Sequence, residues 1–219
     1  MEKFYKVAAI VPALNEGANV GGVLKVLLSS KILDEVILVD DGSTDKTAEI
    51  GKRLGAEVVK LSKNTGKGNA MRQGLTATDA EIIVFFDADL IGLTDEHIFS
   101  LVNPVIQGRA DMCIGVRGRL GGLPRIITKI DPLMAIGGER AIKRHIIEDI
   151  PEKFTQGFAI EIAMDYFCKK NDLKVVYADL PGLSIIIKEK KWGFIKGFVN
   201  RIKMTLQIIK IRLTIKNAI

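Results

Sequence analysis

The sequence predicts an α/β fold in which a mostly parallel central sheet carries helices on both faces. Short apolar runs alternate with segments of helical apolar spacing between residues 7 and 178, which is the pattern of successive strand–helix–strand units. Several runs, such as residues 82–86, are β-branched and aromatic without polar alternation, as expected of strands buried on both faces. The 219 residues, 47% of them hydrophobic, suffice for one domain with a substantial core.

The expected elements follow one another in a regular order, and polar or glycine-containing turns separate them. The first strand is expected to end at the turn of residues 12–17, the second at Asp40-Asp41-Gly42 and the third at residues 64–66. Strands are expected over residues 7–11, 36–39, 57–61, 82–86, 111–115 and 174–178. Helices are expected over residues 20–28, 44–54, 67–76, 96–106 and 157–170. Residues 115–138, rich in Gly, Pro and basic side chains, are expected to form a loop over the functional site.

Composition restricts the class of protein. Cys113 falls in an expected strand and Cys168 in an expected helix, so they do not make a disulfide framework, and a reducing cytosol is favoured. The first ten residues run straight into a strand, so no secretory signal is expected. Since no stretch of about 18 residues lacks charge, no transmembrane helix is expected either.

The net charge of +6 is concentrated at the C-terminus, where residues 185–219 contain nine Lys or Arg and one Glu. We therefore divide the chain into a main domain, residues 1–184, and a basic segment, residues 185–219. Apolar residues in the segment recur at spacings of three and four, at Ile195, Val199, Ile202, Leu206, Ile209 and Leu213. This predicts a C-terminal basic amphipathic helix, for which three roles compete: contact with a membrane surface through residues 188–216, a coiled-coil seam in a homodimer, or packing on its own domain. Nucleic-acid binding is not expected, because aromatic and basic residues do not interleave as such surfaces require.

The most informative motif is Asp87-Ala88-Asp89, which directly follows the buried strand of residues 82–86. Two carboxylates at the C-terminal end of a strand project from the sheet edge at which open α/β folds bind ligands. Paired oxygen ligands there suit Mg²⁺ or Mn²⁺ holding a diphosphate. An isolated Asp-x-Asp is more often a pair of solvated loop residues, but three further polar segments reverse that judgement.

Those segments are residues 11–16, 39–45 and 64–70, and each also follows an expected strand. The carboxyl ends of parallel strands share one edge, so the four segments can converge on one nucleotide diphosphate. Lys67, between Gly66 and Gly68, offers a cation to phosphate, and the glycines permit close backbone approach. The candidate nucleotide-sugar ligands are Pro12, Ala13, Asn15, Glu16, Asp41, Lys67, Asp87, Ala88 and Asp89, with Asp87 and Asp89 also holding the metal. Neither a P-loop nor a dinucleotide-binding glycine fingerprint is present.

In this order the four segments resemble the family 2 glycosyltransferases of the GT-A fold, which is Rossmann-like. The resemblance covers about residues 5–92 and implies transfer of a sugar from a UDP- or GDP-sugar with Mg²⁺ or Mn²⁺ on the donor diphosphate. Polyprenyl- and dolichyl-phosphate mannosyl- and glucosyltransferases are the most similar subgroup, and glucosyl-3-phosphoglycerate synthases are a second one. The second subgroup usually carries a metal-ligating histidine where this chain has Gly182-Leu183-Ser184-Ile185, while His97 and His145 fall in expected helices away from the site.

In the second half the resemblance assigns catalytic roles to Asp89, Arg117 and Glu161, with Arg117 contacting donor or acceptor phosphate and Glu161 acting as a base or as a structural ligand. It places acceptor contacts on Arg117, Gly138, Glu139 and Arg140, beside the segment that begins at Asp131-Pro132. The expected function is hexose transfer to a polyprenyl-phosphate-type acceptor at the cytoplasmic face of a membrane. The alternatives are a small soluble acceptor such as phosphoglycerate, and a non-catalytic nucleotide-sugar-binding subunit.

Overall fold

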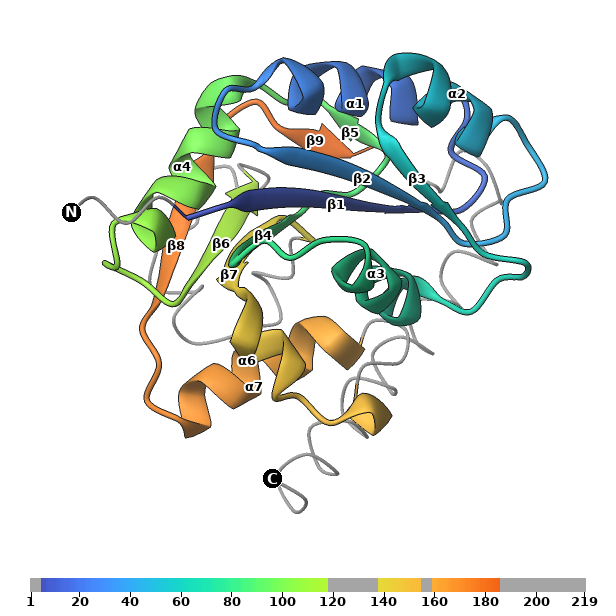
Figure 1. Cartoon of the computed structure of the whole chain (residues 1–219). Coiled ribbons are helices and arrows are strands. Elements are labelled where there is room, and N and C mark those ends of the chain that lie inside the picture. Colours follow the sequence, from blue (N-terminus) through green and yellow to red (C-terminus); the bar gives the residue numbers. More distant parts are fainter. Residues whose placement is uncertain (1–4, 118–137, 155–158, 186–219) are drawn as a thin grey trace, which may run out of the picture.

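The computed structural model describes residues 5–117, 138–154 and 159–185, and its centre is a seven-stranded sheet of order β3-β2-β1-β4-β7-β6-β8 (Figure 1). Every neighbouring pair in it is parallel except the two that β7 makes with β4 and β6. The strands are β1 Val7–Ala13, β2 Glu35–Asp40, β3 Glu57–Lys60, β4 Ile82–Phe85, β6 Met112–Arg117, β7 Arg140–Lys143 and β8 Val175–Leu180, and a separate pair joins β5 Leu90–Ile91 to β9 Ser184–Ile185. The helices are α1 Val20–Ser29, α2 Thr47–Leu54, α3 Lys67–Thr76, α4 Asp95–Ile106, α6 Arg144–Glu148 and α7 Ala159–Lys170, with a 3₁₀ turn at Glu152–Phe154.

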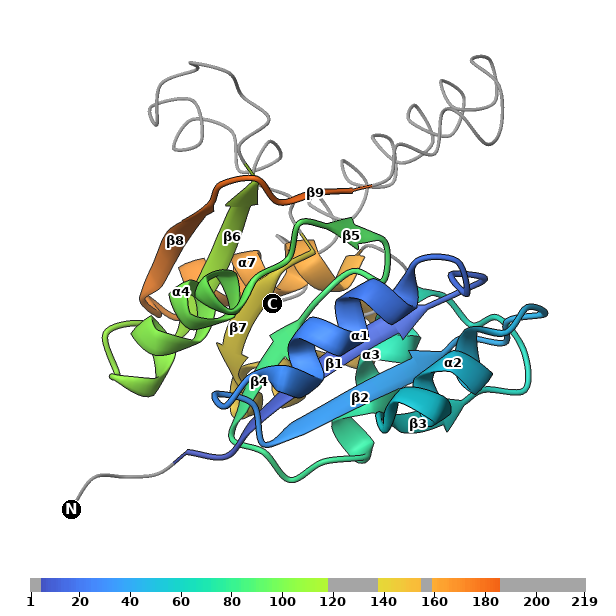
Figure 2. The same cartoon turned by 90° about the horizontal axis from the view of Figure 1, so that it is seen from above.

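Helices cover both faces of the sheet, as Figures 1 and 2 show: α1, α2 and α4 lie on one side, and α3, α6 and α7 on the other. The alternation of side chains along each strand divides the core accordingly. In β1, Val7, Ala9 and Val11 face the first group of helices, whereas Ala8 and Ile10 face the second. The central strands β1 and β4 therefore contain only apolar residues, because both of their faces are buried.

The chain reverses the direction in which it adds strands beside β1. It builds β2 and β3 on one side of β1 and then crosses to place β4 on the other side. A reversal of this kind leaves a crevice outside the carboxyl ends of the two strands, where α/β proteins bind their ligands. The segment after β1 and the Asp-x-Asp motif after β4 both begin at that crevice.

The predicted fold class, an α/β sheet covered on both faces, is confirmed, and each predicted strand and helix that lies among the described residues is present. Helix α2 begins at Thr47 rather than Thr44, because Asp45 accepts hydrogen bonds from the backbone N–H groups of Thr47 (3.0 Å) and Gly17 (2.9 Å) and so holds its own segment in a turn. Residues 118–137, which include most of the predicted loop, and the basic segment from residue 186 onward lie outside the described residues.

Strand β7 was not predicted, whereas a helix at His145 was expected and is present as α6. Residues 137–141 were expected to form a loop on the acceptor side, but Arg140–Lys143 inserts between β4 and β6 and pairs antiparallel with both. The strand has four residues and a charged residue at each end, so its sequence carries little of the apolar run that reveals β4. Its identity as a strand depends on pairing with neighbours that are distant in sequence.

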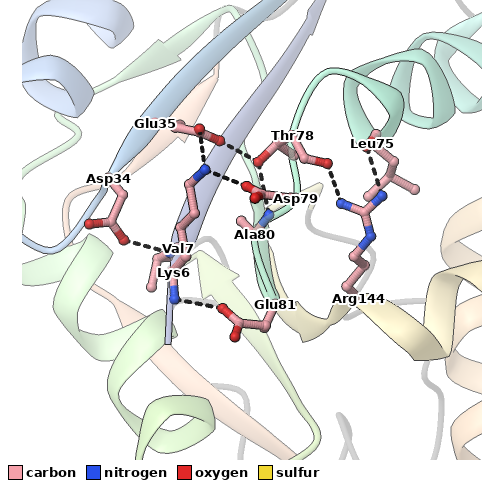
Figure 3. A network of polar contacts seen from close by, with 10 residues as sticks. All are labelled: Lys6, Val7, Asp34, Glu35, Leu75, Thr78, Asp79, Ala80, Glu81 and Arg144. Atoms are coloured by element: carbon pink, nitrogen blue, oxygen red, sulfur yellow. Dashed lines mark hydrogen bonds and ion pairs between the residues drawn. The ribbon is translucent and has the colours of Figure 1, made fainter. Parts of the chain in front are cut away.

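A polar network fixes the opposite end of the sheet, where the parallel strands begin (Figure 3). Lys6 pairs with Glu35 at 2.6 Å and with Asp79, and its backbone N–H donates to Glu81 at 2.8 Å. Arg144 donates to the carbonyl oxygens of Leu75 (3.1 Å) and Thr78 at the end of α3. These contacts align the starts of β1, β2 and β4 with the end of α3, far from the Asp-x-Asp motif.

Both cysteines are buried and unbonded to each other, as predicted. His97 is buried in the first turn of α4, where its ring contacts the carbonyl oxygen of Pro181 at 2.9 Å, which agrees with a structural role. Over the described residues, no helix has the length and apolarity to cross a bilayer.

Two glycines in helices give a matched test of this packing. A Cβ at Gly74 in α3 would lie 2.5 Å from Ile10 Cγ2 of β1, whereas a Cβ at Gly22 in α1 meets nothing within 4 Å. We expect Gly74→Ala to lower the free energy of unfolding by about 1–3 kcal/mol through overpacking. Gly22→Ala should raise it by about 0.5–1 kcal/mol, because alanine loses less backbone freedom on folding. Denaturant unfolding of both variants measures this, and equal effects would contradict the assigned contact between α3 and β1.

Candidate active site

Lys67 brings together carboxylates from two distant parts of the chain. As the first residue of α3 it lies at the carboxyl edge of the sheet, and its Nζ is 2.7 Å from Asp87 Oδ1 and 2.7 Å from Glu161 Oε1. Asp87 follows β4, and Glu161 lies in the first turn of α7. The side chain of Glu161 is only 3% exposed, so its charge depends on Lys67 for compensation. Lys67, Asp87 and Glu161, which the sequence analysis assigned to the site, therefore form one group of ion pairs.

Arg117 reaches Asp87 from the other side. It ends β6, and its NH2 lies 3.7 Å from Asp87 Oδ2 while its Nε lies 3.1 Å from Glu139 Oε2. Glu139 is fully buried, and within the described residues neither of its carboxylate oxygens accepts an aligned hydrogen bond. Asp87 thus lies between a lysine and an arginine, each of which also faces a second carboxylate.

Gly138 permits this arrangement because it has no side chain where the Asp87 carboxylate lies. A Cβ at this position would come within 2.5 Å of Asp87 Oδ1 and 2.7 Å of Oδ2. Any side chain at residue 138 would therefore displace the carboxylate from its two cations. The sequence assigned Gly138 to the acceptor, and the structure gives it a direct effect on Asp87 as well.

The charges in this cluster shift one another's ionisation. Burial alone would lower the pKa of Lys67, but the carboxylates of Asp87 and Glu161 more than offset it and raise that pKa. Burial, together with the negative charge of Asp87, raises the pKa of Glu139 to about 7, although Arg117 acts in the opposite direction. Lys67 therefore stays charged, whereas Glu139 titrates near neutrality.

The loops after β1 and β2 converge as predicted, and side chains lock them together. Asn15 Oδ1 accepts from the backbone N–H of Thr44 at 2.9 Å, and Ser43 Oγ accepts from the N–H of Asn15 at 2.9 Å. Thr47 Oγ1 accepts from the N–H of Glu16, also at 2.9 Å. Pro12 and Ala13 are the last residues of β1 and lie directly before the first of these two loops. These contacts fix the backbone that was predicted to face the nucleotide.

The carboxylate of Asp41 accepts hydrogen bonds from the loop that precedes α3. Its Oδ1 accepts from the N–H and the hydroxyl of Thr65, both at 2.8 Å, and its Oδ2 accepts from the N–H of Gly66 at 2.8 Å. This carboxylate therefore shapes the loop that delivers Lys67, in addition to the nucleotide contact that the sequence predicts. Sequence reasoning missed the parts of Ser43 and Thr65, although small hydroxyl residues beside Asp-Gly and Asn-x-Gly turns are the signal for such loop-locking contacts.

Ala88 and Asp89 complete the motif and are buried at the same edge, directly before β5. Two acceptor assignments are corrected: Glu139 is fully buried and Arg140 is 1% exposed, so neither side chain can contact an acceptor. Arg140 contacts α7 instead, where its NH1 donates to the carbonyl oxygen of Glu161 (3.1 Å) and to Asp165 Oδ1 (3.2 Å). Asp131 lies outside the described residues.

This geometry agrees with comparisons to known proteins. A model of the family described as "Glycosyl transferase family 2" matches residues 8–166. The chain belongs to this family. The match confirms the family predicted from the four segments, and it extends into α7, so that it includes Arg117, Glu139 and Glu161.

Two similar proteins, one of them also as a crystal structure, give the comparison more detail. Glucosyl-3-phosphoglycerate synthase of Mycobacterium tuberculosis is 29% identical over 195 residues, which is 72% of this chain and 59% of that protein. A crystal structure of that synthase with Mn²⁺, UDP and glucosyl-3-phosphoglycerate matches with a TM-score of 0.77 and 25% identity, over 96% of this chain and 80% of that one. The 4,4'-diaponeurosporenoate glycosyltransferase of Staphylococcus aureus is 34% identical over 126 residues, covering 55% of this chain and 32% of that protein. The chain thus spans about three fifths of the length of the synthase.

The raised pKa of Glu139 predicts how stability depends on pH. The folded state holds this proton more tightly than the unfolded state, in which the pKa is near 4.5. The stabilisation is complete below pH 4.5 and is lost as the pH rises through about 7. In metal-free buffer we expect the stability of the native chain to fall, relative to Glu139→Gln, by about 2 kcal/mol between pH 5 and pH 8. Denaturant unfolding at both pH values tests this, and parallel curves for the two proteins would contradict it.

Proposed function

We propose that the chain is a metal-dependent glycosyltransferase that moves a hexose from a UDP-sugar to a small soluble acceptor of the phosphoglycerate type. The observation that carries the proposal is the position of Asp87 between Lys67 and Arg117, at the crevice of a family 2 fold. A metal-dependent transfer from a nucleoside diphosphate uses carboxylates for a divalent cation next to cationic side chains for phosphate. The cluster supplies both.

The acidic residues fit Mg²⁺ or Mn²⁺. These cations take oxygen ligands, and Mg²⁺ is typically held by one or two carboxylates together with phosphate oxygens of the substrate. Asp87 and Asp89 would provide the carboxylates, and the missing side chain of Gly138 lets the Asp87 carboxylate keep its place. In the described parts of the chain no three His, Cys, Asp or Glu form a metal cage by themselves, which agrees with a diphosphate completing the ligand shell. When bound, the cation stabilises negative charge on the departing nucleoside diphosphate.

The remaining residues divide between donor and acceptor. Lys67, which stays charged, would bind the donor diphosphate, and the guanidinium of Arg117 suits an anionic group of donor or acceptor. Glu161 was predicted to be a base or a structural ligand, and its 2.7 Å ion pair with Lys67 favours the second role. The interlocked loops around Asn15, Glu16 and Asp41 would hold the base and ribose.

The soluble acceptor is preferred to a lipid phosphate because of the relatives. Both the sequence match and the structure match lead to a glucosyl-3-phosphoglycerate synthase, and the matched structure holds UDP and Mn²⁺. A lipid acceptor was the first expectation, because the chain resembles the polyprenyl-phosphate enzymes, and a membrane contact through the basic amphipathic residues 188–216 would agree with it. That segment lies outside the described residues. A reaction that depends on a lipid, at a membrane surface, is therefore the alternative outcome of the test below.

The test follows release of nucleoside diphosphate from UDP- and GDP-hexoses with Mn²⁺, in the presence of 3-phosphoglycerate or of polyprenyl phosphate in detergent. We expect UDP release that requires 3-phosphoglycerate, stops on addition of EDTA, and falls by about a hundredfold or more in Asp89→Asn. Release that requires the lipid instead would overturn the acceptor assignment. Binding of UDP-sugar without turnover on either acceptor would favour the non-catalytic alternative.

A second prediction concerns Gly138. Since a Cβ there collides with both carboxylate oxygens of Asp87, Gly138→Ala should reduce kcat/KM by about tenfold to a hundredfold by displacing that carboxylate. Its melting temperature should change little, because the end of an aspartate side chain can move aside. Gly22→Ala is the control and should keep full activity. A fully active Gly138→Ala enzyme would show that Asp87 does not need its present position.

A further inference from the structure

Arg140 is a charged side chain buried where the surrounding core is apolar. It is 1% exposed, and its partners in the sheet register are Phe85 of β4 and Ile114 of β6. Burying a guanidinium costs several kcal/mol unless good partners compensate, and an apolar residue of similar volume is often at least as stabilising. Stability alone therefore does not account for arginine at this position.

The hydrogen bonds of Arg140 connect it to the candidate active site through Glu161. Its NH1 donates to the backbone carbonyl oxygen of Glu161 and to the carboxylate of Asp165, one helical turn later on α7. A bond to the backbone of residue 161 fixes where the side chain of Glu161 begins. That side chain then reaches Lys67 at 2.7 Å, and Lys67 reaches Asp87 at 2.7 Å.

We propose that Arg140 is a positioning residue: by holding the first turn of α7 it aims Glu161 at Lys67, and so sets the place of the Lys67 ammonium beside Asp87. The inference rests on the proposed function only for its consequence, which is the orientation of Lys67 toward a donor diphosphate. The placement of Lys67 itself can be measured without a donor.

Arg144 provides a matched control. It too donates to backbone carbonyl oxygens, those of Leu75 and Thr78 (Figure 3). It also pairs with a carboxylate of its own helix, Glu148. Its contacts hold the C-terminal end of α3, however, whereas Lys67 lies at the N-terminal end. Arg144→Met should therefore lower stability without disturbing Lys67.

The first measurement is the rate at which acetic anhydride acylates Lys67 in the folded protein without metal or nucleotide. The labelled protein is then digested, and mass spectrometry quantifies the peptide that contains Lys67. We expect several-fold faster labelling in Arg140→Met and in Glu161→Gln, and a rate within about twofold of the native one in Arg144→Met. Arg140→Lys retains the charge but lacks the planar fork, so it should give an intermediate rate and serves if Arg140→Met does not fold. Native labelling rates in both Arg140 variants would overturn the proposal.

The second measurement is a double-mutant cycle on the affinity for UDP with Mn²⁺, determined by calorimetry. Arg140→Met should weaken binding by about tenfold or more on its own, but by less than about twofold in the Glu161→Gln background, because it acts through Glu161. Equal losses in both backgrounds would overturn the proposal in favour of a general structural effect. If the native chain binds no UDP while the labelling differences persist, the proposed function fails and the positioning role of Arg140 stands.

Discussion

The position of Asp87 between two cations is the interaction on which the candidate site depends. Its half-buried carboxylate lies near the buried carboxylates of Glu139 and Glu161, and like charges that are shielded from water repel one another. Lys67 compensates Asp87 and Glu161, and Arg117 compensates Asp87 and Glu139. The reversal of strand order beside β1 brings the carboxyl ends of β1 and β4 together, and the parallel sheet supplies the edge at which these charges can gather.

The frame around this cluster consists largely of bonds between side chains and backbone. Asn15 and Asp41 use their oxygens to bind the N–H groups of neighbouring loops. Loop N–H groups have no strand or helix partner, and a buried N–H group without a partner is costly. An acidic turn at the end of β2 can therefore shape the loop before α3 and determine where Lys67 enters the site. In this chain the same motif residues hold the scaffold and border the crevice.

The sequence predicted what depends on local pattern. Apolar runs revealed every strand of the seven-stranded sheet except β7, and the position of each polar segment after a strand indicated that Asp41, Lys67 and Asp87 share one edge. What it could not predict depends on distant pairing. Strand β7 is short and ends in charged residues, so only its contacts with β4 and β6 define it. Arg140 reads as a surface residue by type, and its burial follows from that unpredicted strand. The pairing of Arg117 with Glu139 likewise joins residues that no periodicity relates, and it became visible only once β6 and β7 were neighbours.

Glu139 and Arg140 connect the two halves of the cluster because they are consecutive residues of an extended chain. Neighbouring side chains in such a chain point to opposite faces. Glu139 contacts Arg117, which contacts Asp87, while Arg140 holds Glu161, which reaches Asp87 through Lys67. These two series of contacts start at neighbouring residues and end on the two carboxylate oxygens of Asp87, Lys67 at Oδ1 and Arg117 at Oδ2. A shift of β7 along its neighbours would therefore disturb both cations at once. An antiparallel strand paired on both sides resists such a shift, because a one-residue slip would exchange the faces of every side chain in it.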